Sequence, residues 1–381
     1  MRVLTGARLV LPGGVTPGRI EVAGDRLAHV VPEDPGVPDT TEGDGETFDL
    51  GGAYVLPGFV DLHCHGGGGA AFTVGDEAEA RTVAAFHLAH GTTTMLASLV
   101  TAPVETLVAH ASVLGGLAAE GVVAGVHFEG PFLSAARCGA QDPAHLRAPD
   151  PDAFARMVDA AAGHARMMTF APELPGATDL VARAVAAGVV AAVGHTDATY
   201  DETRAAIDAG ASVATHLFNG MRPVHHREPG PVLACLAAPD VTCELINDGV
   251  HLAGATVAYV AATSRAALVT DAMGAAGMGD GTYQLGSMRI TVAGDTATLA
   301  GTDTIAGSTL TMAAAVRRAV RDVGLDWPAV SVAASLMPAR ALGLADELGS
   351  LEKGKRADLV VLDPDDLEIR GVMRAGRWVS R

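Results

Sequence analysis

The stretch GVVAAVGHTDATYDETRAAIDAGASVATHLFN (Gly188–Asn219) contains two apolar runs separated by an amphipathic segment. The runs GVVAAVGHT and ASVATHLFN have the length of strands, and each ends in a histidine, His195 or His216. Between them, YDETRAAIDAG spaces its apolar residues with the period of a helix. The stretch therefore predicts one strand–helix–strand unit of a parallel sheet.

Similar units recur through the middle of the chain. Further strand-like runs are GTTTMLASL, GVVAGVHFEG, RMMTFAPE and RAALVTDAMG, and further helical stretches are EAEARTVAAFHLAH, DAFARMVDAAAGH and TDLVARAVAAG. This repetition favours an α/β fold of the (β/α)8 TIM-barrel type over a doubly wound sheet. The stretch TYQLGSMRITVAGDTATLAG reads as a hairpin inserted late in the barrel.

Both ends of the sequence differ from the middle. The first residues read as short strands broken by Gly, Pro and Asp, and the stretch from KGKRADLVVLD to RAGRWVSR reads the same way. We therefore expect a small β-sandwich domain formed by both termini, over residues 1–52 and 346–381, with the barrel over residues 53–345.

Composition limits the classes of partner. The formal net charge of −18 repels phosphate backbones, so we expect neither nucleic acid nor an acidic membrane as a partner. No apolar run is long enough to cross a bilayer. The cysteines show no CxxC spacing, which favours reduced thiols and a cytoplasmic protein. They are Cys64, Cys138, Cys235 and Cys243.

Polar residues close the predicted strands. In a TIM barrel the carboxyl ends of the strands carry the chemistry. In PGFVDLHCHGGGG (Pro57–Gly69), the two histidines share one face and Cys64 points the other way. One such pair is weak evidence of a site, but acidic and imidazole groups at several strand ends indicate a shared centre. The candidates are His63, His65, Glu129, His195, His216 and Asp271.

This set of side chains suits a catalytic divalent metal. Imidazoles with carboxylates and no thiolate are typical of zinc, and iron or manganese accept the same ligands. Two ions would need a bridging anion. A carbamylated lysine is excluded, because the only lysines are Lys353 and Lys355 in the predicted C-terminal module. Glu129 is the remaining bridge.

Other glycines and histidines receive structural interpretations. Gly66–Gly69 is not followed by the Lys-Ser/Thr of a P-loop, so we expect a tight turn there. His127 shares the face of Glu129 and is expected to support the site without binding metal. The remaining histidines of helical or loop stretches are expected at the surface: His87, His90, His110, His145 and His164.

Several motifs together resemble the N-acetylglucosamine-6-phosphate deacetylase family of the amidohydrolase superfamily. They are, in order, PGFVDLHCHG, HFEGPF, VGHTDAT, THLFNGM, REPG, NDGVH, VTDAM, AGSTLTM and LGSLEKGKRADLVVLD. The resemblance implies hydrolysis of N-acetyl-D-glucosamine 6-phosphate to glucosamine 6-phosphate and acetate by metal-activated water. It implies that Glu129, His195 and His216 hold one ion, that His63 and His65 hold a second, and that Asp271 is the general base and acid.

The same resemblance implies the substrate contacts. Arg227 and His251 match phosphate-binding residues, helped by Asn219 and Gly220, and the family's homodimer suggests that Arg227 reaches a partner's site. The loop AARCGAQDP (Ala135–Pro143) resembles a mobile active-site loop, which makes Ala140 and Gln141 candidates. Here Gln141 replaces the usual histidine and Cys138 a frequent basic residue. Ile305, Ala306 and Gly307 match a segment that lines the sugar pocket.

Three alternatives remain open at this point. An epimeric galactosamine 6-phosphate substrate differs by one hydroxyl orientation, which these residues do not reveal. A cyclic-amide hydrolase commonly uses the lysine bridge that is missing here. A non-enzymatic scaffold predicts eroded ligands, whereas all six candidate residues are present.

Overall fold

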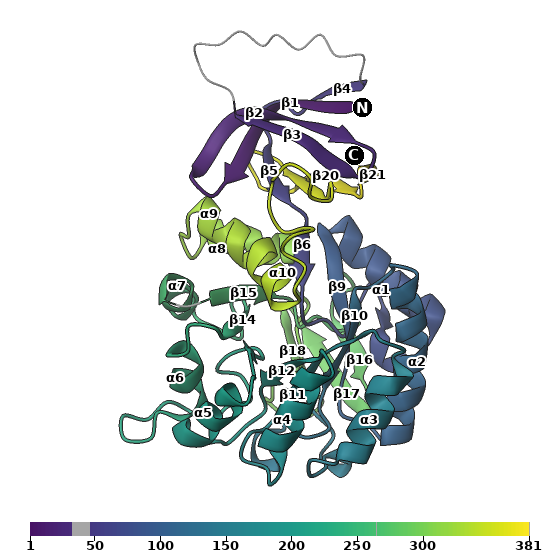
Figure 1. Cartoon of the computed structure of the whole chain (residues 1–381), viewed down its shortest axis with the longest axis vertical. Helices are drawn as coiled ribbons and strands as arrows, with labels where there is room; N and C mark the ends of the chain where they lie inside the picture. Colours follow the sequence, from purple (N-terminus) through teal and green to yellow (C-terminus); the bar gives the residue numbers. More distant parts are fainter. Residues whose placement is uncertain (33–45, 264, 381) are drawn as a thin grey trace. The chain divides into compact units, whose positions relative to one another are not determined.

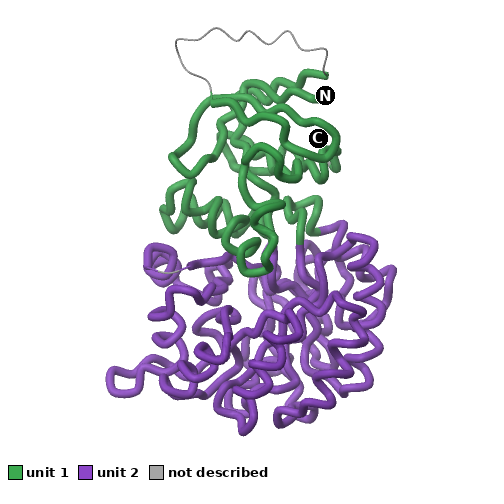
Figure 2. The backbone as a smooth tube through the Cα atoms, in the orientation of Figure 1, with its two compact units in different colours: residues 1–60, 87–94, 312–381 green, residues 61–86, 95–311 purple. Residues whose placement is uncertain are grey.

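A computed structural model describes residues 1–32, 46–263 and 265–380. It divides into two compact units. Unit 1 comprises residues 1–60, 87–94 and 312–381, and unit 2 comprises residues 61–86 and 95–311 (Figure 2). Unit 1 therefore groups residues 312–345 with the terminal strands, whereas the sequence-based boundary predicted at residue 345 follows the alternation of strands and helices.

The predicted barrel is confirmed as eight parallel strands in the order β15-β14-β13-β12-β11-β10-β9-β6 (Figure 1). Their bounds are β6 Phe59–Asp61, β9 Thr92–Leu99, β10 Gly125–Glu129, β11 Ala165–Phe170, β12 Val190–Val193, β13 Val213–Ala214, β14 Thr242–Ile246 and β15 Arg265–Val269. Beyond the ends of β6 and β15, the Asp271 N–H donates to the His63 carbonyl at 2.8 Å, and the His65 N–H donates to the Ala272 carbonyl at 2.8 Å. These bonds join the two outer strands of the sheet.

Helices follow the barrel strands in turn. They are α1 Glu77–Ala89, α2 Val104–Ala119, α3 Pro151–Ala160, α4 Ala177–Ala186, α5 Tyr200–Asp208, α6 Gly230–Leu236 and α7 Gly254–Thr263. Helix α5 shows how the sequence starts a helix soon after a site residue. Its capping box pairs the Thr199 side chain with the Glu202 backbone and the Glu202 side chain with the Thr199 backbone. The chain turns from His195 into this helix within a few residues.

Short elements occupy the loops of unit 2. They are β7 Gly66–Gly67, β8 Ala70–Ala71 and the 3₁₀ turns η1 Phe72–Val74, η2 Ala135–Arg137 and η3 Pro143–His145. The glycine run makes the expected tight turn, with Gly68 at φ 64° and Gly69 at φ 85°. The predicted late hairpin is a three-stranded antiparallel sheet of β16 Gly281–Leu285, β17 Met288–Ala293 and β18 Thr296–Leu299.

Unit 1 contains the sheet expected from both termini. Its strands run β21-β20-β19-β5-β1-β2-β3, with β4 paired to β1. The bounds are β1 Arg2–Leu11, β2 Gly14–Ala23, β3 Arg26–Pro32, β4 Glu46–Asp49, β5 Tyr54–Pro57, β19 Leu359–Leu362, β20 Ile369–Arg374 and β21 Arg377–Ser380. The same unit holds α8 Met312–Arg321, α9 Trp327–Ser331, the π-helical turn η4 Val332–Leu336 and α10 Met337–Ala341.

The surface position predicted for His87 is wrong. His87 is fully buried, as are Ala80 and Val83, which lie seven and four residues earlier in α1. Residues at this spacing share one face of a helix, so His87 belongs to the buried face of α1. The other four histidines of that group are partly exposed.

Candidate active site

The strand ends of unit 2 bring all six candidate residues together. His63 and His65 follow β6, Glu129 ends β10, His195 follows β12, His216 follows β13 and Asp271 follows β15. Three of them have left-handed backbone, with φ of 45° at His195, 28° at His216 and 48° at Asp271. Non-glycine residues adopt this conformation only where the surrounding structure holds them, and such positions concentrate at functional sites.

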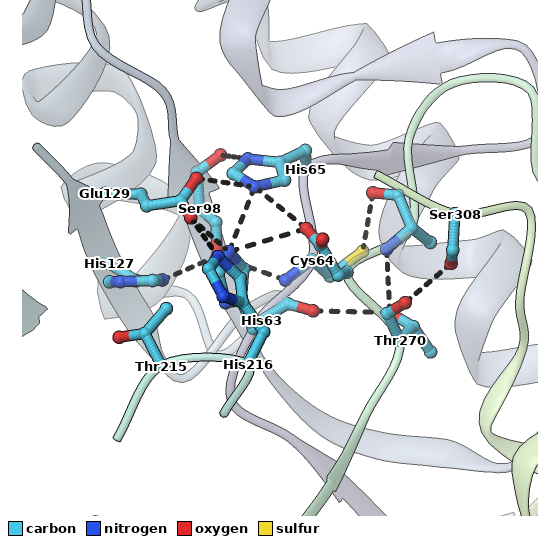
Figure 3. Close-up of polar contacts among 12 residues, drawn as sticks. His63, Cys64, His65, Ser98, His127, Glu129, Thr215, His216, Thr270 and Ser308 are labelled. Carbon is cyan, nitrogen blue, oxygen red and sulfur yellow. Dashed lines mark hydrogen bonds and ion pairs between the residues drawn. The ribbon is translucent and has the colours of Figure 1, made fainter. Parts of the chain in front are cut away.

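Glu129 lies at the centre of the cluster. Its Oε1 is 3.0 Å from His195 Nε2 and 2.9 Å from His216 Nε2, and its Oε2 is 3.2 Å from His65 Nε2. His63 Nε2 lies 3.5 Å from Glu129 Oε1. Figure 3 shows His63, His65 and His216 pointing toward this carboxylate. One carboxylate therefore contacts four imidazoles.

Asp271 completes the cluster on the side of the first two histidines. Its Oδ1 lies 3.3 Å from His65 Nε2 and 3.6 Å from His63 Nε2. The Nε2 atoms of His63 and His65 are themselves only 3.0 Å apart. Two overlapping groups therefore have ligand atoms close enough for an ion, His63–Glu129–His216 and His63–His65–Asp271.

The outer nitrogens of the rings fix which nitrogen faces the centre. His65 Nδ1 lies 3.1 Å from the Ser98 carbonyl, His195 Nδ1 2.8 Å from the Arg137 carbonyl and His216 Nδ1 3.1 Å from the Asn219 carbonyl. A carbonyl only accepts, so each Nδ1 carries the hydrogen, and the Nε2 lone pair of the neutral ring points inward. Inward lone pairs beside carboxylate oxygens form a donor set that suits a divalent cation.

The two carboxylates at the centre of the cluster favour the protonated, positively charged form of the nearby histidines. Burial opposes the imidazolium form, yet the Glu129 and Asp271 carboxylates raise the pKa of His63 well above its usual range and that of His65 to about 9. Burial also opposes ionisation of Glu129, but the charges of His63 and His195 hold its pKa well below its usual range. A metal ion would thus replace protons that these histidines otherwise bind.

His127 supports the cluster from one side. Its ring nitrogens contact Ser98 Oγ at 2.9 Å and Thr169 Oγ1 at 3.0 Å, and its ring lies edge-on to His63 at 4.7 Å. Burial and the nearby His63 charge lower its pKa well below the usual range. Both nitrogens already have hydroxyl partners, so His127 orients its neighbours and offers no free ligand atom.

A cavity of about 280 Å³ opens over the cluster and contains most of the predicted substrate residues. Its lining includes the predicted residues His65, Glu129, Ala140, Gln141, His195, His216, Asn219, Gly220, His251, Asp271, Ile305 and Gly307. His63 and Ala306 are fully buried and do not line it. The sequence interpretation missed Gly139, Leu285, Asp303 and Thr304, which also line it and come from loops or from the inserted sheet.

Gln141 contacts the metal-ligand cluster directly. The Thr101 backbone N–H donates to Gln141 Oε1 at 2.7 Å, which orients the side-chain amide. Its Nε2 then donates to Glu129 Oε2 at 2.6 Å. Gln141 is therefore buried against the Glu129 carboxylate, at the edge of the cavity.

The two predicted phosphate residues differ in position. His251 lines the cavity, and its Nδ1 lies 2.7 Å from Asp248 Oδ2. Burial opposes its charge, but the Asp248 hydrogen bond raises its pKa. Arg227 is exposed on the loop before α6, where its Nη1 lies 2.7 Å from His226 Nε2, and it is not among the residues that line the cavity.

The lysines and cysteines agree with the sequence interpretation. Lys355 donates to Ser350 Oγ at 2.6 Å within unit 1, so it is engaged outside the cluster.

None of the four cysteines forms a disulfide. Cys64 Sγ lies 3.5 Å from the Gly66 carbonyl, and burial raises its pKa well above the usual range. Among the described residues, no helix combines the length and apolarity needed to cross a membrane.

Comparisons with known proteins agree with this geometry. The model of the amidohydrolase family matches residues 54–379. The N-acetylglucosamine-6-phosphate deacetylase of Bos taurus is 37% identical over 353 residues, which cover 88% of this chain and 85% of the relative. The N-acetylgalactosamine-6-phosphate deacetylase of Escherichia coli is 36% identical over 389 residues, which cover 99% of each chain.

A solved structure extends the likeness to the whole fold. It is an aspartate-to-alanine mutant of the Mycobacterium smegmatis N-acetyl-D-glucosamine-6-phosphate deacetylase in complex with N-acetyl-D-glucosamine-6-phosphate. The TM-score is 0.94 at 48% identity, over 100% of this chain and 99% of that one. The chain therefore belongs to the amidohydrolase family and, within it, to the N-acetylglucosamine-6-phosphate deacetylase group of hydrolases.

Proposed function

We propose that this protein hydrolyses the N-acetyl group of N-acetyl-D-glucosamine 6-phosphate, giving glucosamine 6-phosphate and acetate. The observation that carries the proposal is the convergence of four imidazole Nε2 atoms on the Glu129 carboxylate beneath a cavity with His251 in its wall. Relatives named for this activity support the choice of substrate.

The donor set fits a divalent metal centre. Glu129, His195 and His216 would hold one ion, and His63 and His65 would hold a second, with Glu129 shared between them. Zinc suits these ligands best, and iron or manganese accept them as well. When bound, such ions supply a water whose pKa is lowered to about 7, and they polarise the amide carbonyl.

Asp271 moves the proton. It lines the cavity, and although burial opposes its ionisation, the charge of His63 lowers its pKa, so the carboxylate is ionised at neutral pH. In that state it accepts a proton from the attacking water as the water adds to the acetamide carbon. It then returns the proton to the amine, which leaves as a neutral group when the carbon–nitrogen bond breaks.

The rest of the cavity would bind the sugar phosphate. His251 would supply positive charge, because burial opposes its charge but the Asp248 hydrogen bond raises its pKa, and Asn219 and Gly220 also line the cavity. Ala140, Ile305 and Gly307 would shape the sugar pocket, with the buried Ala306 between the last two in the chain, and Gln141 would border the acetamide through its contact with Glu129. We infer a homodimer in which Arg227, exposed in one chain, reaches the partner's phosphate.

N-acetyl-D-galactosamine 6-phosphate is a second candidate substrate. The Escherichia coli relative named for that substrate matches 99% of both chains at 36% identity. We also propose a cytoplasmic location, because the cysteines form no disulfides and both substrates are sugar phosphates.

An acetate-release assay tests the proposal. The purified, metal-loaded protein is given N-acetylglucosamine 6-phosphate, its galactosamine epimer, or N-acetylglucosamine without phosphate. We expect hydrolysis of the first at the highest kcat/KM and a large loss without phosphate. Absence of acetate from both phosphorylated sugars, with metal bound, would refute the proposed function, and a preference for the epimer would establish the second candidate.

A further inference from the structure

Glu244 is a buried carboxylate next to the metal-ligand cluster. It lies inside β14 and is fully buried. Its Oε2 is 3.2 Å from His63 Nδ1 and accepts from the His216 backbone N–H at 3.1 Å. Its Oε1 has no hydrogen-bond partner within the described residues. Such a buried carboxyl group calls for an explanation, because a polar atom that is buried without a partner destabilises the fold.

The four imidazoles of the cluster differ in their outer partners. His65, His195 and His216 each donate from Nδ1 to a neutral backbone carbonyl. Only His63, within this set of four, has a carboxylate in that position. An anion on one ring nitrogen increases the electron density on the other, which makes that ring a stronger ligand, and it also fixes the ring's orientation.

Glu244 contacts two members of the cluster through one oxygen. Its Oε2 lies against His63 Nδ1 and accepts from the His216 backbone N–H, while Oε1 has no partner in the described part of the chain. The inner nitrogen of the same ring, His63 Nε2, faces His65, Asp271 and Glu129. Glu244 and the candidate metal position therefore lie at opposite nitrogens of one imidazole.

We propose that Glu244 is a positioning residue that selects the His63–His65 half of the cluster for a second divalent ion. The inference rests on the proposed function, since it takes the centre to bind metal. Glu244 orients the His63 ring through Nδ1, raises the donor strength of Nε2 and supplies the negative charge that offsets the second cation. The His195–His216 half has no such anion and relies on Glu129.

A competing explanation is a purely structural ion pair. In that case His63 stays protonated and pairs with Glu244 on one side and with Glu129 and Asp271 on the other. No second ion would then be bound, and the Glu244 charge would not affect metal content. The two explanations differ in metal stoichiometry, which is measurable without any activity assay.

The test compares metal binding by the whole protein and by Glu244→Gln, which keeps the size of the side chain and removes its charge. Metal-free protein is titrated with zinc, and with cobalt for its absorption spectrum, and bound metal is counted by mass spectrometry. We expect two ions in the wild type. In Glu244→Gln, affinity for one ion should fall about 10- to 100-fold while the other ion remains bound.

Glu173→Gln is the matched control. Glu173 is a partly buried carboxylate of the same unit that accepts from Thr196 Oγ1 at 2.6 Å and from the Asp197 N–H at 2.7 Å, and neither of these partners is an imidazole of the cluster. The Glu173→Gln protein should bind both ions with wild-type affinity. If Glu244→Gln does not fold, Glu244→Asp replaces it in the test, because it keeps the carboxylate but shortens the side chain by one methylene. Glu244→Asp should bind the second ion more weakly than the wild type does.

The outcomes separate this inference from the proposed function. Wild-type protein that binds no metal at all would overturn the proposed function. Wild-type protein with two ions, matched by Glu244→Gln or Glu244→Asp with the same two affinities, would overturn only the role of Glu244. Equal weakening of both ions would also overturn it, because Glu244 would then hold the cluster as a whole instead of selecting one half.

Discussion

The two ends of the cavity differ in how completely one chain builds them. At the metal-ligand end, six side chains from five strand ends meet in contacts of 3.6 Å or less, and each imidazole has an outer partner. At the phosphate end, His251 lies in the wall with Asp248 behind it, but Arg227 is exposed and is not part of the lining. In the proposed function, catalytic chemistry thus depends on side chains at the barrel strand ends, while recognition of the phosphate depends on loops.

The largest effect is expected at the metal-ligand end, from Asp271→Asn. This change keeps the side-chain shape but removes the proton acceptor, so kcat should fall about 10²- to 10⁴-fold. Metal content and substrate affinity should change little, because Glu129 and the histidines remain. Steady-state kinetics with metal counting on the same sample check this. Near-normal kcat would contradict the role assigned to Asp271.

The next effect is expected at the phosphate end, from Arg227→Ala. Loss of a charge-assisted hydrogen bond to phosphate should cost roughly 1.5–3 kcal/mol of substrate binding, seen as a higher KM with kcat nearly unchanged. Mixing this variant with inactive Asp271→Asn chains should restore active sites with normal KM if Arg227 acts across a dimer. A fully active monomer with wild-type KM would contradict that arrangement.

Protons should compete with metal at the metal-ligand end of the cavity only. Because carboxylates raise the pKa of His65 to about 9, this ring is protonated in metal-free protein below that pH and must lose its proton to bind an ion. Apparent zinc affinity should therefore rise about tenfold per pH unit for each proton displaced, and level off above about pH 9. Competition with a chromogenic chelator between pH 6 and pH 9 measures this, and a flat profile would argue against it.

The smallest effect is expected from Asp248→Asn. Its carboxylate raises the pKa of His251, so the imidazolium that binds phosphate persists to a higher pH and is lost as the pH rises through that pKa. In the variant the rise in KM should begin at lower pH, with roughly a tenfold change or less near neutrality. A KM–pH profile identical to that of the wild type would remove His251 from the phosphate end.

The sequence predicts the metal-ligand end better than the rest. Histidines and acids that close apolar runs converge because parallel strands of a barrel share one carboxyl edge. The role of Glu244 is not predicted from a strand end, because Glu244 lies inside the run VTCELI. A lone acid in an otherwise apolar strand is nevertheless a signal of a buried polar role. The surface position predicted for His87 is wrong because His87 shares the buried face of its helix with Ala80 and Val83.

The cavity walls were harder to predict. Asp303 and Thr304 reach the cavity from the segment after β18, where no local periodicity marks them. Gln141 lines the cavity as the resemblance implies, but its orientation toward Glu129 by Thr101 is set by the tertiary fold and does not follow from the spacing of residues. Loop residues of this kind are positioned by neighbours distant in the sequence.

Restoring metal to stripped protein is the most direct test of the central claim, that imidazoles and a shared carboxylate gather cations which drive deacetylation. Protein freed of metal by exhaustive chelation is titrated with zinc while acetate release from N-acetylglucosamine 6-phosphate is followed. We predict no turnover in the stripped protein and a return of activity in proportion to bound zinc. Full activity in protein with no detectable metal would contradict the account.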